Sequence, residues 1–113
     1  MKLFADKNLT KSIDNCFSFG IVPVGETKKI TLWVKNDSSP KVTGILKDLE
    51  FDVICLDPEN ETVITDERII ILEAPKEMSQ FAVAPISLEW TPNIDLEQGL
   101  KAVLNIKAKK IVG

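Results

Sequence analysis

The sequence contains no histidine and no tyrosine among its 113 residues. Histidine is the commonest general base in enzymes and tyrosine is a common proton donor, so both of these catalytic groups are excluded. Without an imidazole, a cysteine nucleophile lacks its usual partner, and a thiolate and imidazole zinc site cannot be assembled. The five glycines are scattered and form no phosphate-binding loop. We therefore expect a non-enzymatic protein with no metal, no cofactor and no small-molecule substrate.

Charge of one sign and long apolar runs are also scarce. The formal net charge is only -3, which gives no electrostatic reason to expect nucleic acid or an anionic membrane as a partner. No apolar run approaches the roughly 20 residues that a membrane-spanning helix needs. Residues 1–7 contain no apolar signal core. We expect a cytoplasmic or virion location, and no secretion through a signal peptide.

The sequence is instead rich in period-two alternation, while helical periodicity is nearly absent. The clearest strand covers residues 27–35, where Ile30, Leu32 and Val34 share one face. Turn residues separate this strand from others at similar spacing, which predicts an all-β, immunoglobulin-like β-sandwich of about seven strands. Residues 16–113 are expected to form this single domain, and residues 1–15 form either an N-terminal arm or a first strand. Further strands are predicted at residues 16–22, 48–56, 62–65, 68–72, 86–90 and 100–109.

The spacing of these strands also predicts how some of them connect. The corner Pro23-Val24-Gly25 is expected to join strands that lie in different sheets. Residues 86–90 and 100–109 are predicted to form a hairpin around the loop between them. Alternation predicts a core that contains Leu32, Phe51, Leu88, Trp90, Leu104 and Ile106.

Cys16 and Cys55 flank Trp33, which suggests a comparison with the Cys, Trp, Cys pattern of antibody-type domains. Both cysteines precede the middle of the chain, so the last two strands would have none. Alternation places Cys55 in the core, where a thiol behaves as a small hydrophobe. We expect two free thiols, as in a reducing compartment.

Five acidic residues cluster near one predicted hairpin. Their spacing matches no calcium-binding loop, so we expect a solvated acidic turn. They are Asp57, Glu59, Glu61, Asp66 and Glu67.

Trp33 is out of phase with the apolar positions of its strand, so it is expected on the outer face of its sheet. Interface hot spots are rich in tryptophan, and we predict that Lys29, Thr31, Trp33 and Lys35 form an interface. The alternative is that the N-terminal arm, or residues 42–46, cover Trp33 within the same chain.

A row of lysines marks the last predicted strand. Lys101, Lys107 and Lys109, followed by Lys110, form a secondary candidate interface. The simpler interpretation is that lysines on an edge strand prevent unwanted pairing. Nucleic-acid binding is not expected, because no exposed aromatic residues for base stacking lie nearby.

Two segments resemble immunoglobulin-like domains of the abnormal-spindle/hydin (ASH) and major-sperm-protein-like type. The first reads Phe19-Gly20-Ile21-Val22-Pro23-Val24-Gly25 and continues as Ile30-Thr31-Leu32-Trp33-Val34-Lys35-Asn36. The second reads Ile86-Ser87-Leu88-Glu89-Trp90-Thr91-Pro92, followed after Gly99 by Ala102-Val103-Leu104-Asn105-Ile106. The resemblance implies a sandwich of seven or eight strands, used as a structural or docking module. Between residues 42 and 78 only the number of strands matches, and the basic peptide-binding groove of the membrane-contact members has no counterpart.

Related small immunoglobulin-like domains also occur on phage virions. Taken together with the missing catalytic groups, the resemblance leads us to expect a structural protein built into or decorating a larger assembly, with a virion capsid or tail component favoured. The alternative is a cytosolic or ciliary scaffold domain that docks a protein partner. Either way, the partners are expected to be proteins.

Overall fold

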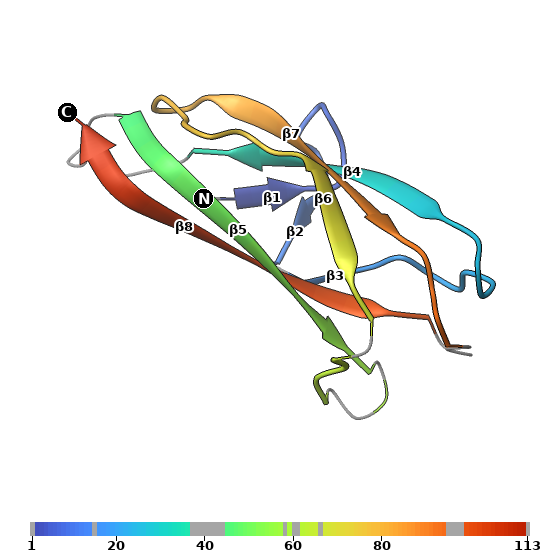
Figure 1. Cartoon of the computed structure of the whole chain (residues 1–113). Helices are drawn as coiled ribbons and strands as arrows, with labels where there is room; N and C mark the ends of the chain where they lie inside the picture. The colour runs from blue at the N-terminus through green and yellow to red at the C-terminus, as the bar shows by residue number, and fades with distance from the viewer. Residues whose placement is uncertain are drawn as a thin grey trace.

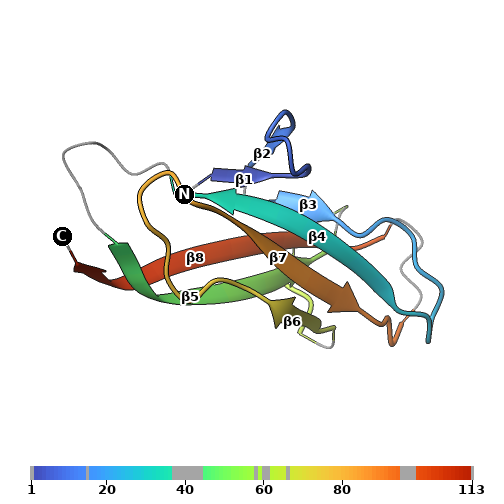
Figure 2. The same ribbon diagram turned by 90° about the horizontal axis from the view of Figure 1, so that it is seen from above.

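The computed structural model describes residues 2–14, 16–36, 45–57, 59, 62–65, 67–94 and 99–112, with only the backbone for 109–112. Within them the protein is all-β, and two antiparallel sheets pack together as a sandwich (Figures 1 and 2). The all-β sandwich predicted from the sequence is confirmed, with eight strands. They are β1 (Lys2–Phe4), β2 (Ser12–Ile13), β3 (Cys16–Ser18), β4 (Lys28–Lys35), β5 (Ile45–Leu56), β6 (Ile69–Glu73), β7 (Val83–Trp90) and β8 (Lys101–Val112).

The larger sheet has five strands in the order β2-β1-β4-β7-β6. β4 and β7 pair along their whole length, from Lys28 opposite Trp90 to Lys35 opposite Val83. β1 pairs with the other side of β4, and β2 pairs with β1. The first residues of the chain therefore extend the sheet that β4 organises.

The smaller sheet has three strands in the order β3-β8-β5, with β8 in the centre. The corner at residues 23–25 connects β3 to β4, so it joins different sheets as predicted. The predicted hairpin of the last two strands is wrong, because β7 and β8 also lie in different sheets. Both sides of β7 are already paired, with β4 and β6, so the chain after β7 crosses to the other layer.

Most of the order follows an immunoglobulin domain, whose sheets read A-B-E-D and C-F-G. In their order across the larger sheet, β1, β4, β7 and β6 correspond to A, B, E and D, and in the smaller sheet β5 and β8 correspond to C and F. The departure is at β8, where β3 from the start of the chain occupies the side that strand G takes in an antibody domain.

The core lies between the two sheets and is centred on Trp90, which is 1% exposed. The Phe19 ring meets the Trp90 ring edge-on, with 5.8 Å between centroids. Of the six predicted core residues, Phe51 and Ile106 are only partly buried. Phe51 is less buried than predicted because β5 is the last strand of its sheet and faces an open side of the sandwich. The four that are buried are Leu32, Leu88, Trp90 and Leu104.

Several predicted segments differ in extent from the observed strands. β3 ends at Ser18, although the strand was predicted to continue to residue 22, and β7 begins at Val83, three residues before the predicted start. β5 begins at Ile45, three residues before the predicted start, and Asp48 within it has a positive φ of 52°. Residues 42–44 lie outside the described residues. Residues 62–65 form a single bridge, Val63 opposite Leu56, and no full strand.

Candidate protein-interaction surfaces

The predicted interface residues share one face of the larger sheet. β4 alternates, so Lys29, Thr31, Trp33 and Lys35 point away from the core that Leu32 and its neighbours enter. The Thr31 and Ser87 hydroxyls lie 3.3 Å apart across β4 and β7. The opposite positions on β7 are Glu89, Ser87, Pro85 and Val83.

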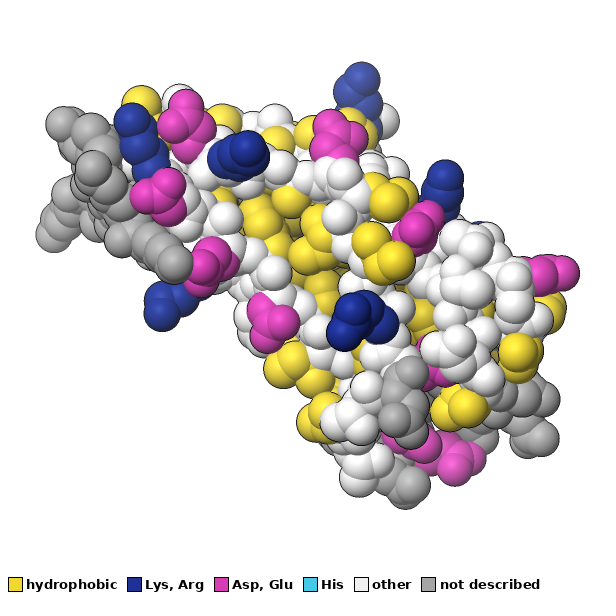
Figure 3. Space-filling view, viewed as in Figure 1, with side chains coloured by type: hydrophobic (Ala, Val, Ile, Leu, Met, Phe, Trp, Pro, Cys, Tyr) yellow, Lys and Arg dark blue, Asp and Glu magenta, His cyan; other side chains and the backbone are white. Residues whose placement is uncertain are grey.

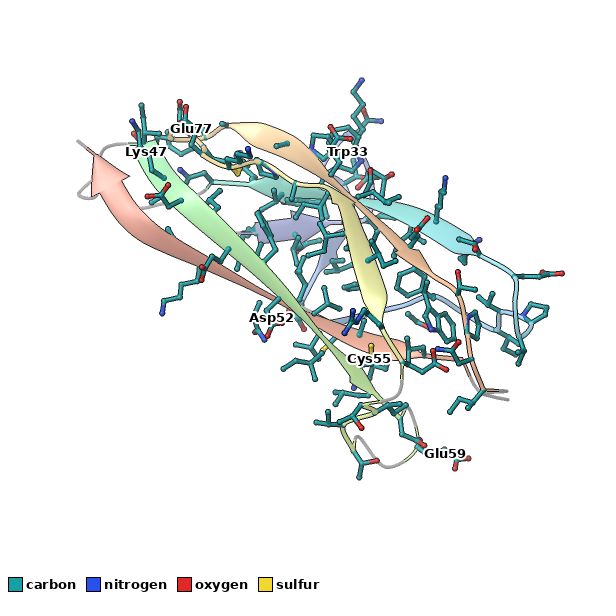
Figure 4. The ribbon with its side chains drawn as sticks, viewed as in Figure 1. Trp33, Lys47, Asp52, Cys55, Glu59 and Glu77 are labelled. Carbon is teal, nitrogen blue, oxygen red and sulfur yellow. The ribbon has the colours of Figure 1, made fainter. Side chains whose placement is uncertain are left out.

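Trp33 stands half-buried on this outer face, between Pro85 on β7 and Phe4 on β1 (Figure 4). Leu3 enters the core, so Phe4 faces the same outer side as Trp33, where it is nevertheless buried. The outer position expected for Trp33 is confirmed, β1 lies beside it as the alternative expected, and the interface stays a prediction. The N-terminal strand covers one side of the indole ring and leaves the rest accessible.

Exposed apolar side chains continue from Trp33 toward one end of the sheet. Val83 is 42% exposed and Phe81 is 58% exposed. The Lys35 ammonium lies 5.8 Å from the centroid of the Phe81 ring, within range of a cation–π contact. We call Trp33, Phe81, Val83 and Pro85 the outer apolar patch.

The lysine row lies on the smaller sheet. Its strand, β8, is central at residues 101–103, where β3 pairs with it, and has only β5 as a partner among the described residues beyond that point. The interpretation of the row as edge protection is therefore wrong for Lys101, and it stays a prediction for the later part of the strand. Lys107 is exposed and lies opposite Glu50 on β5. The Lys109 side chain lies outside the described residues.

A buried carboxylate ties the larger sheet to the crossing that follows β7. Glu67 is 5% exposed, and its Oε2 accepts a hydrogen bond of 2.9 Å from the Trp90 indole N–H. Its Oε1 accepts bonds from the backbone amides of Asn93 (2.9 Å) and Ile94 (3.0 Å). Glu67 was expected in a solvated acidic turn, and this expectation is wrong. The three N–H groups that bond to Glu67 are more than 20 residues away in the sequence, so the residues around Glu67 give no sign that it is buried.

The rest of the acidic cluster behaves as a turn where it is described. The Asp57 side chain accepts a bond of 2.8 Å from the Glu59 amide, which closes a local turn. Glu61 and Asp66 lie outside the described residues. Among the residues that the structure describes, no three His, Cys, Asp or Glu side chains are placed to hold a metal ion.

Asn36 is a second buried polar residue that the sequence analysis missed. It is fully buried at the end of β4, and its Nδ2 donates to the backbone carbonyls of Met78 and Ser79, both at 3.1 Å. Its own backbone exchanges bonds with Ala82 and Phe81. Asn36 thus holds the connection between β6 and β7 against β4. An asparagine directly after a strand is the signal that was available.

Both cysteines are free thiols, as expected, with Cys16 exposed and Cys55 buried. Cys55, which Figure 4 labels near the end of β5, lines a pocket of about 240 Å³ together with Glu67 and Ile69. Burial raises the pKa of the Cys55 thiol, the charge of Glu67 raises it further, and a backbone hydrogen bond from Ile69 opposes them.

Alkylation is expected to separate the two thiols. Only the thiolate reacts, so in the folded protein Cys16 should be labelled much faster than Cys55, which is buried and has a raised pKa. Mass spectrometry over a time course should show one label first and two after unfolding. Equal labelling rates would contradict the buried position of Cys55, and no label after unfolding would indicate a disulfide.

The described residues contain no helix, and hence none that is long and apolar enough to span a bilayer. A scan against protein-family models and searches of curated proteins and of solved structures found no match to this chain.

Proposed function

We propose that this protein is a non-enzymatic structural module, built into or decorating a larger assembly, with a virion capsid or tail component favoured. The observation that carries the proposal is the outer apolar patch, in which a half-buried tryptophan adjoins exposed Val83 and Phe81. Large aromatic and aliphatic side chains left open on one sheet face are characteristic of protein interfaces. The resemblance to ASH and major-sperm-protein-like domains, which serve as structural and docking modules, supports the same proposal.

The polar members of the predicted interface surround the patch in a way that suits a protein partner. Lys29 and Lys35 lie at the two ends of the exposed face of β4, and Thr31 lies between Lys29 and Trp33. Interfaces commonly have an apolar centre and a polar rim. A cytosolic or ciliary scaffold domain that docks one partner is the second candidate. The size of the native particle separates the two, because a structural component is found only in the large assembly.

Trp33→Ala is expected to weaken incorporation into the assembly by tenfold or more, because a buried tryptophan at an interface commonly contributes about 2 kcal/mol or more. The ring is half-buried in the isolated protein, so its free energy of unfolding should fall by only about 1–2 kcal/mol. Urea unfolding measures the second quantity. Incorporation is measured by sedimentation of particles formed with tagged wild-type and variant chains.

Ile21→Ala is the matched control, since Ile21 is 71% exposed and lies outside the patch. It should change neither quantity appreciably. A loss of several kcal/mol in the Trp33 variant would show that Trp33 is mainly core. Unchanged incorporation with retained stability would move the contact to another face, with the lysine row the next candidate.

A further inference from the structure

The chain itself closes the outer edge of β5 near its start, where Leu46 and Met78 exchange two backbone bonds of 2.9 Å, and again near its end. Toward its start, the Leu49 amide donates a bond of 3.0 Å to the Lys76 carbonyl. Toward its end, the Cys55 carbonyl accepts a bond of 2.8 Å from the Ile64 amide. Both bonds lie on the side of β5 that faces away from β8.

The open part of the edge presents the backbone of Phe51 and Val53. Backbone groups alternate in direction along a strand, and those of Leu49 and Cys55 point away from β8. The amide and carbonyl groups of Phe51 and Val53 therefore point the same way. Within the described part of the chain, no backbone group bonds them on that side. A short row of donors and acceptors is thus available to an added strand.

The space beside this edge is hollow and partly apolar (Figure 3). Phe51 and Val53 are only half-buried, so their inner side chains border the open side of the sandwich. A pocket of about 440 Å³, lined by Leu49 and Lys76 among others, lies at one end. The pocket beside Cys55 lies at the other end. A segment added here would set alternate side chains over apolar surface.

The face of β5 toward solvent is acidic. Asp48, Glu50 and Asp52 are exposed there, and Figure 3 shows acidic side chains along the line of β5. Glu50 lies opposite Lys107 on β8, whereas Asp52 lies opposite Asn105. A second copy paired edge to edge about a two-fold axis would bring these carboxylates together, and like charges across strands are destabilising. These acids favour basic residues on the solvent-facing side of an added strand, whereas Arg68 and Lys76 line the pockets at the two ends of the edge.

We propose that the β5 edge between Leu49 and Cys55 binds a short extended segment of a partner protein by strand addition. The segment carries lysine or arginine at the positions beside Glu50 and Asp52, and aliphatic residues at the positions beside Phe51 and Val53. Main-chain bonds supply affinity in this mode, and the alternating side chains supply specificity. This site lies on the smaller sheet and is independent of the outer apolar patch.

The probe is a blocked hexapeptide of alternating lysine and valine, and its charge-reversed form has glutamate for lysine. In the free protein the Phe51 and Val53 amides should exchange rapidly with solvent. Saturating lysine peptide should slow the exchange of both amides at least tenfold in NMR spectra, and the glutamate peptide should not. Slow exchange in the free protein, no protection by the lysine peptide, or equal protection by both peptides would overturn the proposal.

Two variants locate the site. Val53→Pro removes the outward amide but leaves the pairing with β8, since proline is tolerated where a strand amide faces away from its neighbour. It should weaken peptide binding at least tenfold. Glu50→Gln with Asp52→Asn should weaken binding roughly fivefold and reduce its salt dependence. Both of these acids are exposed, so this pair tests the site even if the proline variant fails to fold.

The matched control is Asp14→Asn with Glu26→Gln, which removes two exposed carboxylates away from β5. Its affinity for the lysine peptide should equal that of the wild type. If the control loses as much affinity as the β5 pair, the binding is a non-specific charge effect and the proposal fails. A concentration-dependent dimer that protects Phe51 and Val53 without peptide would instead assign the edge to a second copy.

Discussion

Replacing Gly99 with alanine is expected to lower the free energy of unfolding by about 3–4 kcal/mol, because a new Cβ would meet fixed backbone. The atom would lie 2.6 Å from the Gly20 carbonyl oxygen and 2.8 Å from its carbonyl carbon. The two segments are held together there, since the Phe19 amide donates to the Leu100 carbonyl at 3.3 Å. The φ of Gly99 is also +82°, a conformation that alanine adopts only at a cost of about 1–2 kcal/mol.

Gly25→Ala separates the two causes. Gly25 has nearly the same φ, +85°, but nothing lies within 4 Å of a Cβ placed there. The free energy of unfolding of this variant should fall only by the cost of the positive φ, about 1–2 kcal/mol. Urea unfolding of both variants gives the difference, which measures the close approach of Gly99 to Gly20. Equal losses in the two variants would show that the backbone moves apart at little cost.

Replacing Glu67 with alanine is expected to lower the free energy of unfolding by about 3 kcal/mol. The change leaves the buried Trp90 indole N–H without its acceptor, and an unsatisfied buried donor costs about 1–3 kcal/mol. The two backbone amides of Asn93 and Ile94 lose the same carboxylate. They lie in exposed residues, so water replaces part of that loss. Glu67→Gln keeps the shape and one acceptor, and should lose less.

Urea unfolding and a double-mutant cycle with Trp90→Phe check this prediction. The phenylalanine retains an aromatic ring but no N–H, so the Glu67→Ala loss should shrink in its presence if the indole bond carries much of it. Glu26→Ala is the control, because Glu26 is exposed and should lie within about 0.5 kcal/mol of the wild type. An equal loss in the Glu26 and Glu67 variants would contradict a structural role for the buried carboxylate.

Alternation along β4 and β5 was sufficient to predict strands and the faces they present. Each inward position holds an apolar residue, so the pattern is repeated several times within one strand. A shift of the strand register by one residue would bury its lysines or acids, so the phase is well determined. The outer position of Trp33 followed from this phase. The exposed fraction of Trp33 could not be predicted in this way, because the strand beside it, β1, comes from a remote part of the chain.

The failures concern long-range partners. β7 and β8 each read correctly as a strand, but the choice between pairing with each other and crossing between sheets depends on which edges other strands have already taken. Glu67 reads as one more acid in a polar turn, and its burial depends on an indole that arrives 23 residues later. Asn36 is similar, since the carbonyls it bonds belong to a connection more than 40 residues away.

The central place of β8 in the smaller sheet has a consequence for the order of folding. β3 and β5 are synthesised first, but both pair only with β8 in that sheet, and β8 is made last. All five strands of the larger sheet have been synthesised before β8, whereas no strand of the smaller sheet can pair until β8 is present. Such distant pairing slows folding, because the chain must close long loops before any contact is gained. Until β8 emerges, β5 is a long strand with no partner on either side in its sheet. Charged residues on a hydrophobic strand oppose aggregation, so we expect the acids of β5 to protect the nascent chain before any mature contact forms.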